Sequence, residues 1–195
     1  MDTDHKTASK GNVDENYVDY QKIADAMKYY AALGYTAISV PWIVAAAAGE
    51  ATRPKHAEPL DTCLGRLPAS GENSFLSMIM EGKLPPGKYV CCTPCFRDEE
   101  KLDALHKNAF IKVELIDTVD CDFQQLLDDA YGFLSQYLPC EVIDFEDGTK
   151  DIVTANEGIE LGSYGVREIS PFGKWAYGTG LAEPRLSYVL QVQKQ

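Results

Sequence analysis

Apolar residues recur along this chain with two periods, and each period predicts a different kind of element. Helical spacing runs through a segment near the start, at Tyr20, Ile23, Met27, Tyr30 and Ala31, and Gly34 follows as a stop signal. The same spacing extends from Phe123 to Leu138, where Pro139 ends it. We therefore expect two long helices with one buried face each, and a shorter helix over residues 74–81.

Strand-like segments lie between and after these helices. The first covers residues 35–40. Two more lie on either side of a polar loop at residues 97–108, which joins them. Four short strands follow the second long helix, at residues 141–146, 150–155, 158–162 and 175–180, with a tight turn at Asp147-Gly148. A closing helix is expected from Leu181 onward, with Pro184 in its first turn. This order predicts an α+β fold, an antiparallel sheet flanked by helices, with residues 45–68 as a loop over a site.

Composition fits one globular domain with a short extension. The chain has 195 residues, of which 45% are hydrophobic and 25% charged. Residues 1–16 are polar and predict a mobile tail, so the domain should cover residues 17–195. The longest apolar stretch, residues 42–49, is too short to span a bilayer, and the N-terminus lacks the apolar core of a signal peptide. We expect a cytoplasmic protein with no membrane partner.

Charge gives the clearest indication about partners. Thirty acidic residues stand against 18 Lys and Arg, a net charge of −12, and no basic run occurs. Proteins that bind nucleic acid usually present a basic face that displaces counterions from phosphates. The chain is therefore not expected to bind DNA, and tRNA is possible but not favoured, although acidity can also serve solubility alone.

Chemistry concentrates on the two strands joined by the polar loop. Period-2 alternation puts Phe110, Lys112 and Glu114 on one face of the second strand, with core residues on the other. A flat ring can cover a purine, an acid can bind an amine, and Arg97 at the exit of the first strand can meet a phosphate with a planar fork of donors. The alternative is an ordinary hairpin with surface ion pairs.

Four segments resemble the motifs of one family, in the family's order. Residues 94–99 and 110–115 read PCFRDE and FIKVEL, and they resemble motif 2 of the class II aminoacyl-tRNA synthetases, especially the seryl-type enzymes. Residues 178–185, GTGLAEPR, resemble motif 3, and residues 70–72 resemble the Thr-x-Glu loop of the same enzymes. Residues 34–44, GYTAISVPWIV, resemble motif 1, which builds the dimer interface in that family and so implies a homodimer.

A second member of the superfamily is also similar. Residues 98–106, DEEKLDALH, and residues 160–167, ELGSYGVR, look like stretches of the ammonia-dependent asparagine synthetase, which has no tRNA substrate. Together the resemblances imply a class II synthetase-like fold that binds ATP, Mg²⁺ and an amino acid.

The resemblance assigns the nucleotide contacts residue by residue. Arg97 would hold the α-phosphate and the attacking carboxylate, and Arg185 the outer phosphates and the adenine stacked on Phe110; these two arginines would be the catalytic residues. The remaining ATP contacts would be Glu99, His106, Glu160 and Ser163.

Acidic and polar residues make up the rest of the expected site. Glu160 resembles the acid that binds Mg²⁺, with Glu168 as a second candidate, because magnesium prefers hard oxygen ligands. The amino acid would meet Ser70, Glu72, Glu114 and Arg167, and Arg167 has the alternative of a salt bridge with Glu168 or Glu160. The spacing of Cys91, Cys92 and Cys95 disfavours structural zinc, since the other three cysteines are scattered.

Three classes of function fit this pattern. The first is an ATP-dependent ligase that forms an aminoacyl-adenylate and transfers the amino acid to an acceptor other than tRNA. The second is a minimal aminoacyl-tRNA synthetase. The third is a catalytically silent paralogue that binds nucleotide or amino acid and regulates a partner, which the retained phosphate-handling arginines disfavour.

Overall fold

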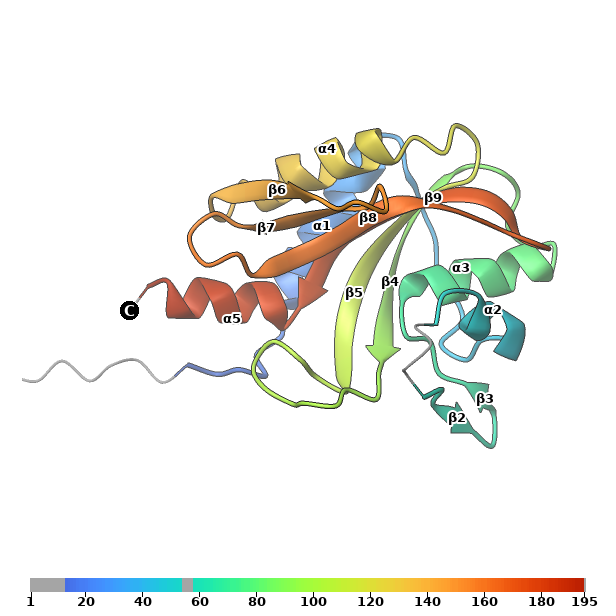
Figure 1. Cartoon of the computed structure of the whole chain (residues 1–195), viewed down its shortest axis with the longest axis horizontal. Helices are drawn as coiled ribbons and strands as arrows, with labels where there is room; N and C mark the ends of the chain where they lie inside the picture. Colours follow the sequence, from blue (N-terminus) through green and yellow to red (C-terminus); the bar gives the residue numbers. More distant parts are fainter. Residues whose placement is uncertain (1–12, 54–57, 195) are drawn as a thin grey trace, which may run out of the picture.

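A seven-stranded, mostly antiparallel sheet forms the centre of the molecule (Figure 1). The computed structural model describes residues 13–53 and 58–194. Across the sheet the strands run in the order β1 (Thr36–Ala37), β4 (Lys88–Phe96), β5 (Ala109–Asp117), β9 (Gly173–Glu183), β8 (Glu160–Ile169), β7 (Lys150–Thr154) and β6 (Cys140–Asp144). Only the β1–β4 pair is parallel. The α+β prediction is confirmed.

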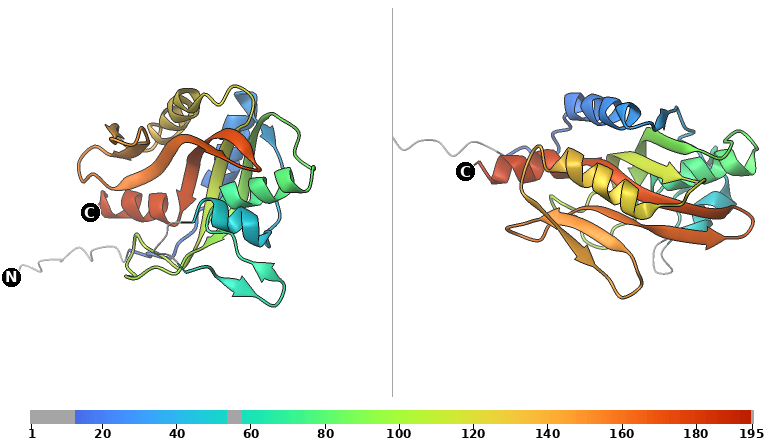
Figure 2. Two further views of the ribbon diagram at one scale, coloured as in Figure 1. Left: turned by 45° about the vertical axis from the view of Figure 1, so that its right-hand side comes forward. Right: turned by 90° about the horizontal axis from the view of Figure 1, so that it is seen from above.

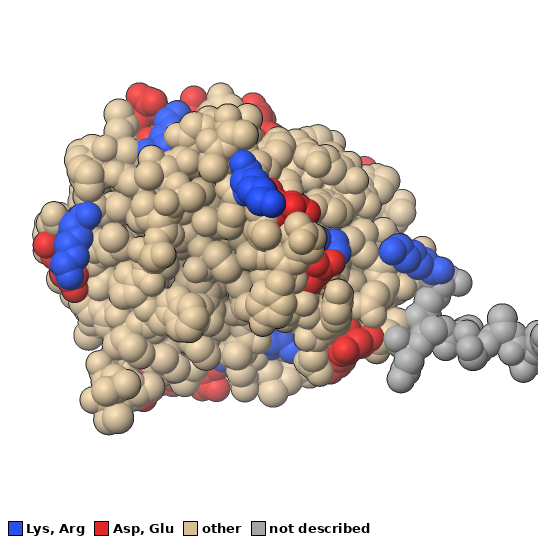
Figure 3. Space-filling model, turned by 180° about the vertical axis from the view of Figure 1, so that it is seen from behind, with Lys and Arg blue, Asp and Glu red and all other residues tan. Residues whose placement is uncertain are grey.

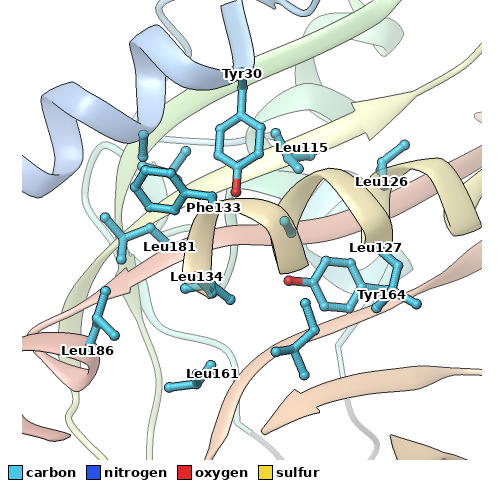
Figure 4. Packing of buried hydrophobic residues seen from close by; sticks show 14 of the residues in the cluster. Tyr30, Leu115, Leu126, Leu127, Phe133, Leu134, Leu161, Tyr164, Leu181 and Leu186 are labelled. Carbon is cyan, nitrogen blue, oxygen red and sulfur yellow. The ribbon is translucent and has the colours of Figure 1, made fainter. Parts of the chain in front are cut away.

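Two helices cover one face of the sheet. They are α1 (Tyr20–Ala32) and α4 (Phe123–Leu134), which contact each other; in Figure 1 α4 lies above the strands and α1 behind them. The side chains of Asp19 and Asp122 cap their first turns by accepting backbone N–H bonds. Their buried residues form the main core with alternate residues of β4, β5, β8 and β9, as Figure 4 shows for Tyr30, Phe133, Tyr164 and Leu181.

The other face of the sheet packs against α3 (Gly71–Met80) and α2 (Ala46–Ala51). A second core there includes the fully buried side chains of Phe75, Leu76 and Trp175. Val90 and Cys91 are neighbours on β4 and belong to different cores, because successive strand residues point to opposite faces. The alternation read from the sequence therefore separates the two layers.

The last elements stand at the ends of the sheet. Helix α5 (Arg185–Val192) follows β9 directly, and the small β2 (Asp61–Thr62) and β3 (Gly65–Arg66) hairpin projects beside α2 (Figure 2). Arg66 bonds to both Asp61 and Glu50, which ties this hairpin to α2. None of the helices in the described part of the chain combines the length and apolar character required to cross a lipid bilayer.

Several predicted boundaries were wrong. The first strand is two residues long instead of six, and residues 45–68 contain α2 and the β2–β3 hairpin instead of a simple loop. Helix α3 begins at Gly71 because Ser70 and Asn73 form a capping box, which draws the helix start ahead of the expected residue 74. Helix α4 ends at Leu134, before a turn over residues 135–138. Leu181 belongs to β9, where it pairs with Val113, so the closing helix begins four residues later than expected.

The expected tail lies largely outside the described residues, which begin at residue 13. Residues 13–16, its last part, make contacts with the domain. The Asp14 N–H donates to Gln191 Oε1 at 2.9 Å, and Glu15 pairs with Lys107 at 2.9 Å. These contacts join the segment to α5 and to the loop between β4 and β5.

Candidate functional site

One cavity of about 680 Å³ opens on the face of the sheet that carries α3. Its walls come from α3, from the loop between β4 and β5, and from the cavity-facing residues of β5, β8 and β9. All but one of the residues predicted from the sequence line it, namely Ser70, Glu72, Arg97, Glu99, His106, Phe110, Glu114, Glu160, Ser163, Arg167 and Arg185. The fold thus gathers side chains that are up to 115 positions apart in the sequence (185 minus 70).

Glu168, the second candidate for Mg²⁺, is the exception, because it does not line the cavity. It follows Arg167 on β8 and pairs in register with Lys174 at the exposed end of the strand. Because Arg167 lines the cavity, strand alternation turns its neighbour to the opposite face. Glu168 is not among the cavity residues.

Arg97 lies across the aromatic ring of Phe110. Its guanidinium carbon is 5.1 Å from the ring centroid, and its Nε donates to the Ala69 carbonyl at 3.0 Å. Cys95 and Phe110 are partners in the β4–β5 ladder, so the hairpin itself brings Arg97 and Phe110 together. In this structure Arg97 therefore covers the ring that was expected to stack on adenine.

Arg185 joins three parts of the cavity wall. Its Nη1 donates to the backbone oxygen and to Oε1 of Glu160, both at 3.2 Å, and its Nη2 donates to the Leu105 carbonyl at 3.2 Å. The side chain is about one fifth exposed. A guanidinium held by backbone oxygens keeps its positive charge available for an anion, because only one carboxylate opposes it.

The loop between β4 and β5 is ordered by Asp103. This carboxylate accepts from the N–H groups of Leu105 and His106 and lies 2.9 Å from His106 Nδ1. Those bonds, the Leu105 N–H first, lower the pKa of Asp103 to about 2. Glu99 is held in the same loop through its N–H, which donates to Asn108 Oδ1 at 3.3 Å. His106 and Glu99 therefore sit at the cavity mouth on a defined turn.

Glu114 is a buried acid, and one of its two carboxylate oxygens has no hydrogen-bond partner in the described structure. It is 1% exposed, and its Oε2 accepts from Ser70 Oγ at 2.7 Å and lies 3.0 Å from Lys112 Nζ. Its Oε1 is fully buried and has no hydrogen-bond partner in the described structure. An unsatisfied buried carboxylate oxygen is costly, so this atom points to a cationic or donating ligand.

Glu72 is also buried, but its partners are protein groups. Its Oε1 accepts from Trp175 Nε1 at 2.6 Å and lies 3.1 Å from Arg167 Nε. Burial raises the pKa of Glu72, and Arg167 opposes that shift. Arg167 in turn lies over the Tyr177 ring, 4.6 Å from its centroid. Its ion-pair partner is Glu72, and not Glu168 or Glu160.

Three site residues on β9 were missed by the sequence reasoning. Trp175, Tyr177 and Thr179 alternate along β9 on the cavity face, and Tyr177 and Thr179 line the cavity. The period-2 pattern of the segment WAYGT could have identified them, because it pairs with the strand that carries Arg167. Asp103 was also missed, since nothing local in the sequence marks it as the residue that orders the loop.

Comparisons with known proteins agree on the fold. No protein-family model matches this chain, and no curated protein matches it in sequence. Among solved structures it matches the seryl-tRNA synthetase of Pyrococcus horikoshii complexed with ATP, at a TM-score of 0.72 and 15% identity over 89% of this chain and 50% of that one. It also matches the pyrrolysyl-tRNA synthetase of Desulfitobacterium hafniense, at a TM-score of 0.65 and 18% identity over 90% of this chain and 69% of that one.

A third solved structure, the cytoplasmic serine-tRNA ligase of Naegleria fowleri in complex with AMP, gives the same result. Its TM-score is 0.64 at 17% identity, over 88% of this chain and 52% of the ligase. The chain spans roughly half to two thirds of the length of these enzymes. At such low identity the likeness establishes the architecture, and the chemistry must be argued from the cavity.

Proposed function

From the class II synthetase fold that this chain shares with those structures, we propose that the protein is an ATP-dependent ligase. It activates an amino acid as the aminoacyl-adenylate and transfers it to an acceptor other than tRNA. The observation that supports this proposal is that positively charged groups and a buried acid line the same cavity. Two guanidinium groups, of Arg97 and Arg185, stand in the same space as the unpartnered buried oxygen of Glu114.

The two kinds of group match the two halves of an adenylation reaction. Adenylate formation requires a carboxylate to attack the α-phosphate of ATP while negative charge builds up on the phosphate oxygens and on pyrophosphate. Arg97 and Arg185 supply fixed positive charge for those oxygens. Phe110 offers an aromatic ring for the base, which would take the place that Arg97 occupies over this ring here, and Glu99 offers a carboxylate for its amino group.

The buried acids suit an amino acid better than a simple carboxylic acid. Glu114 Oε1 lacks a donor, and an α-ammonium group would supply one. Ser70 and Lys112 hold the other oxygen, which orients the carboxylate. Glu72, which we expected to share this task, is occupied by Trp175 and Arg167 and supports Arg167 instead. Arg167 then faces the substrate from the far wall, where it can bind a carboxylate or an adenylate phosphate.

Magnesium fits the nucleotide side of the cavity through Glu160. This carboxylate is half exposed and bonds to Arg185 through Oε1 only. Within the described residues no three acidic, His or Cys side chains converge on a metal position. Mg²⁺ can be held by one carboxylate together with several waters and substrate phosphates. When bound, the ion would neutralise phosphate charge, with Ser163 as a neighbouring polar group on the same strand.

The acceptor is proposed from charge. The net charge of −12 disfavours the phosphate backbone of tRNA, and the loop between β4 and β5 brings four acids, Asp98, Glu99, Glu100 and Asp103, to the cavity beside Lys101 and Lys107. An amine, a carrier protein or a small metabolite would not meet this repulsion. The resemblance of residues 98–106 and 160–167 to the ammonia-dependent asparagine synthetase also supports an acceptor other than tRNA. The alternative acceptor is tRNA, as in a minimal aminoacyl-tRNA synthetase.

A homodimer is proposed from the surface around β1. Residues 29–49 contain no Lys, Arg, Asp or Glu, and they include the exposed side chains of Leu33 and Trp42, the latter 61% exposed. The molecule seen from behind shows few charged side chains (Figure 3). An uncharged surface with an exposed Trp favours a protein partner. Sedimentation should give about twice the 21.6 kDa of the chain, and Trp42→Glu should shift it toward the monomer.

Exchange of labelled pyrophosphate into ATP tests the proposed activation step. We expect exchange that depends on one amino acid among the twenty, and its loss in Arg97→Ala. Arg97→Lys is the matched variant, because it keeps the charge and removes the planar fork. Lys83→Ala, a substitution on the exposed surface outside the cavity, should leave the rate unchanged.

The outcomes separate the three classes of function. Exchange without charging of total tRNA supports the proposed ligase, whereas charging of tRNA supports the minimal synthetase. ATP binding without exchange for any amino acid would favour a regulatory paralogue. The last outcome would contradict an adenylating enzyme.

A further inference from the structure

Glu183 is a buried acid beside the nucleotide side of the cavity that the proposed reaction does not use. It is the last residue of β9, two positions before Arg185, and it has no exposed surface. Its backbone pairs with Ile111 of β5, so its place in the sheet is fixed. A carboxylate in such a position carries a cost in stability, and the contacts it makes must explain why it is there.

Both oxygens of Glu183 contact the first turn of α5. Oε2 accepts from the Ser187 N–H at 3.3 Å, and Oε1 accepts from Ser187 Oγ at 2.9 Å. The residue at the helix start, Pro184, provides no side-chain cap. The first turn of a helix leaves backbone N–H groups without partners, and a carboxylate is favourable there. Glu183 therefore acts as the cap that α5 otherwise lacks.

Arg185 is the first residue of the helix that Glu183 caps. Its guanidinium reaches Glu160 on β8 and the Leu105 carbonyl in the loop, each at 3.2 Å. The direction in which Arg185 leaves the backbone depends on how the first turn of α5 joins β9. The Glu183–Ser187 contacts close that junction.

We propose that Glu183 is a positioning residue: as a carboxylate it closes the first turn of α5 and thereby holds Arg185 in its phosphate-binding position. This inference rests on the proposed nucleotide function of the cavity. A protonated Glu183 keeps the hydroxyl contact but loses the charge that favours the helix start. Binding of a nucleotide should then weaken, since Arg185 is less firmly placed.

The groups around Glu183 set the pH range of this effect. Burial raises the pKa of Glu183 to about 7, against the opposing bonds from Ser187. On α1, Lys22 and Asp19 form an ion pair with each other, and their charges act on Glu183 in opposite directions. Tyr137, after α4, is the remaining titratable neighbour, and its raised pKa keeps it neutral in this range. Glu183 is therefore the group that changes charge near pH 7 in this cluster.

The effects on stability and on function have opposite signs, which makes the inference testable. Because the pKa of Glu183 is higher in the folded protein than the usual carboxyl value of 4.5, the folded state binds more protons between pH 4.5 and 7. This group's contribution to stability is present below that range and is lost as pH rises to 7. A neutral Gln should consequently not destabilise the protein at pH 8.5, while it removes the charge that positions Arg185.

The experiment compares the full chain with Glu183→Gln at pH 6.0 and pH 8.5. Affinity for MgATP is measured by calorimetry, and thermal unfolding is followed in parallel. In the wild type we expect MgATP affinity to rise about three- to tenfold from pH 6.0 to 8.5, beyond the change shown by Glu183→Gln. The titration of ATP itself is common to both proteins. The variant should unfold at pH 8.5 at the same temperature as the wild type or higher.

Two results would overturn the inference. Equal affinities and equal pH dependence in both proteins would show that Glu183 does not act on Arg185. A variant less stable than the wild type at pH 8.5 would show a purely structural role.

Failure of the proposed nucleotide function is a separate result, seen as no MgATP binding by the wild type at either pH. Amide hydrogen exchange then still tests whether Glu183 caps α5. Protection of the Ser187 amide at pH 8.5 should be lower in Glu183→Gln than in the wild type, and equal protection would refute the cap. Ser187→Ala is the matched control, because it removes the hydroxyl contact and keeps the acid.

Discussion

The two ends of the cavity, which we name the nucleotide end and the amino-acid end after the proposed function, are built by different means. At the nucleotide end, Arg97 and Arg185 come from a loop and a helix start, and backbone oxygens of Ala69, Leu105 and Glu160 hold them. At the amino-acid end, Glu72 and Glu114 lie on a helix and a strand, and both are less than 5% exposed. One end presents positive charge from a loop and a helix start, and the other presents negative charge from a helix and a strand.

The difference shows where each end draws its selectivity. The two guanidinium groups meet the phosphate oxygens on which negative charge develops during the reaction. Buried carboxylates cannot move without breaking packing, so they discriminate by whether a ligand supplies the missing donor. The nucleotide end should therefore govern rate, and the amino-acid end should govern which substrate is accepted. The predictions that follow test this division.

The largest effect is expected for Arg185→Ala. Removal of a guanidinium that stabilises developing phosphate charge should lower pyrophosphate exchange by roughly 100- to 1,000-fold, with little change in the KM for the amino acid. Steady-state exchange at varied ATP and amino acid measures both parameters. Arg185→Lys should recover part of the rate. A change of less than about threefold in Arg185→Ala would place the phosphates elsewhere.

The next effect is expected for Glu114→Gln. The amide keeps an acceptor for Ser70 but loses the charge that an ammonium group requires, so the KM for the amino acid should rise roughly 10- to 100-fold. The KM for ATP should stay within about twofold, because Glu114 lies at the other end. Equal increases in the KM for ATP and in the KM for the amino acid would contradict the separate roles of the two ends.

Trp175→Phe should affect stability more than catalysis. The variant removes the N–H that bonds to Glu72 at 2.6 Å and leaves that buried oxygen without this donor. The free energy of unfolding should fall by about 1–3 kcal/mol. Denaturant titration measures it, and the double variant with Glu72→Gln should be less destabilised than the sum of the two single changes. Additive losses would mean that the indole contributes only packing.

The sequence predicted the parts of the site that lie on regular elements. Alternation along residues 110–115 placed Phe110 and Glu114 on the cavity side, and the structure agrees because a strand with one buried face has only one usable register. The α+β sheet followed from the same periodicity. Motif 3 placed Arg185 in the cavity although the start of its helix was misjudged.

Other features depend on contacts between distant segments, which no local pattern encodes. Glu72 turned out to serve Trp175 and Arg167, which are 103 and 95 positions away (175 minus 72 and 167 minus 72). Glu168 lies outside the cavity because a single-residue step along β8 reverses the face. The β2–β3 hairpin was missed because each strand has two residues, too few to show a period.

The smallest effect is expected for Tyr177→Leu. Its ring supports the Arg167 guanidinium at 4.6 Å, a contact between a cation and an aromatic face worth about 0.5–1 kcal/mol. The KM for the amino acid should rise by about two- to fivefold in the exchange assay, with the ATP dependence unchanged. Tyr177→Phe keeps the face and should match the wild type. If Phe and Leu weaken binding equally, the hydroxyl group is the contributor, and Arg167 is placed by Glu72 alone. The orientation of the Arg167 guanidinium would then depend on the buried acids of the amino-acid end, as the binding of the substrate does.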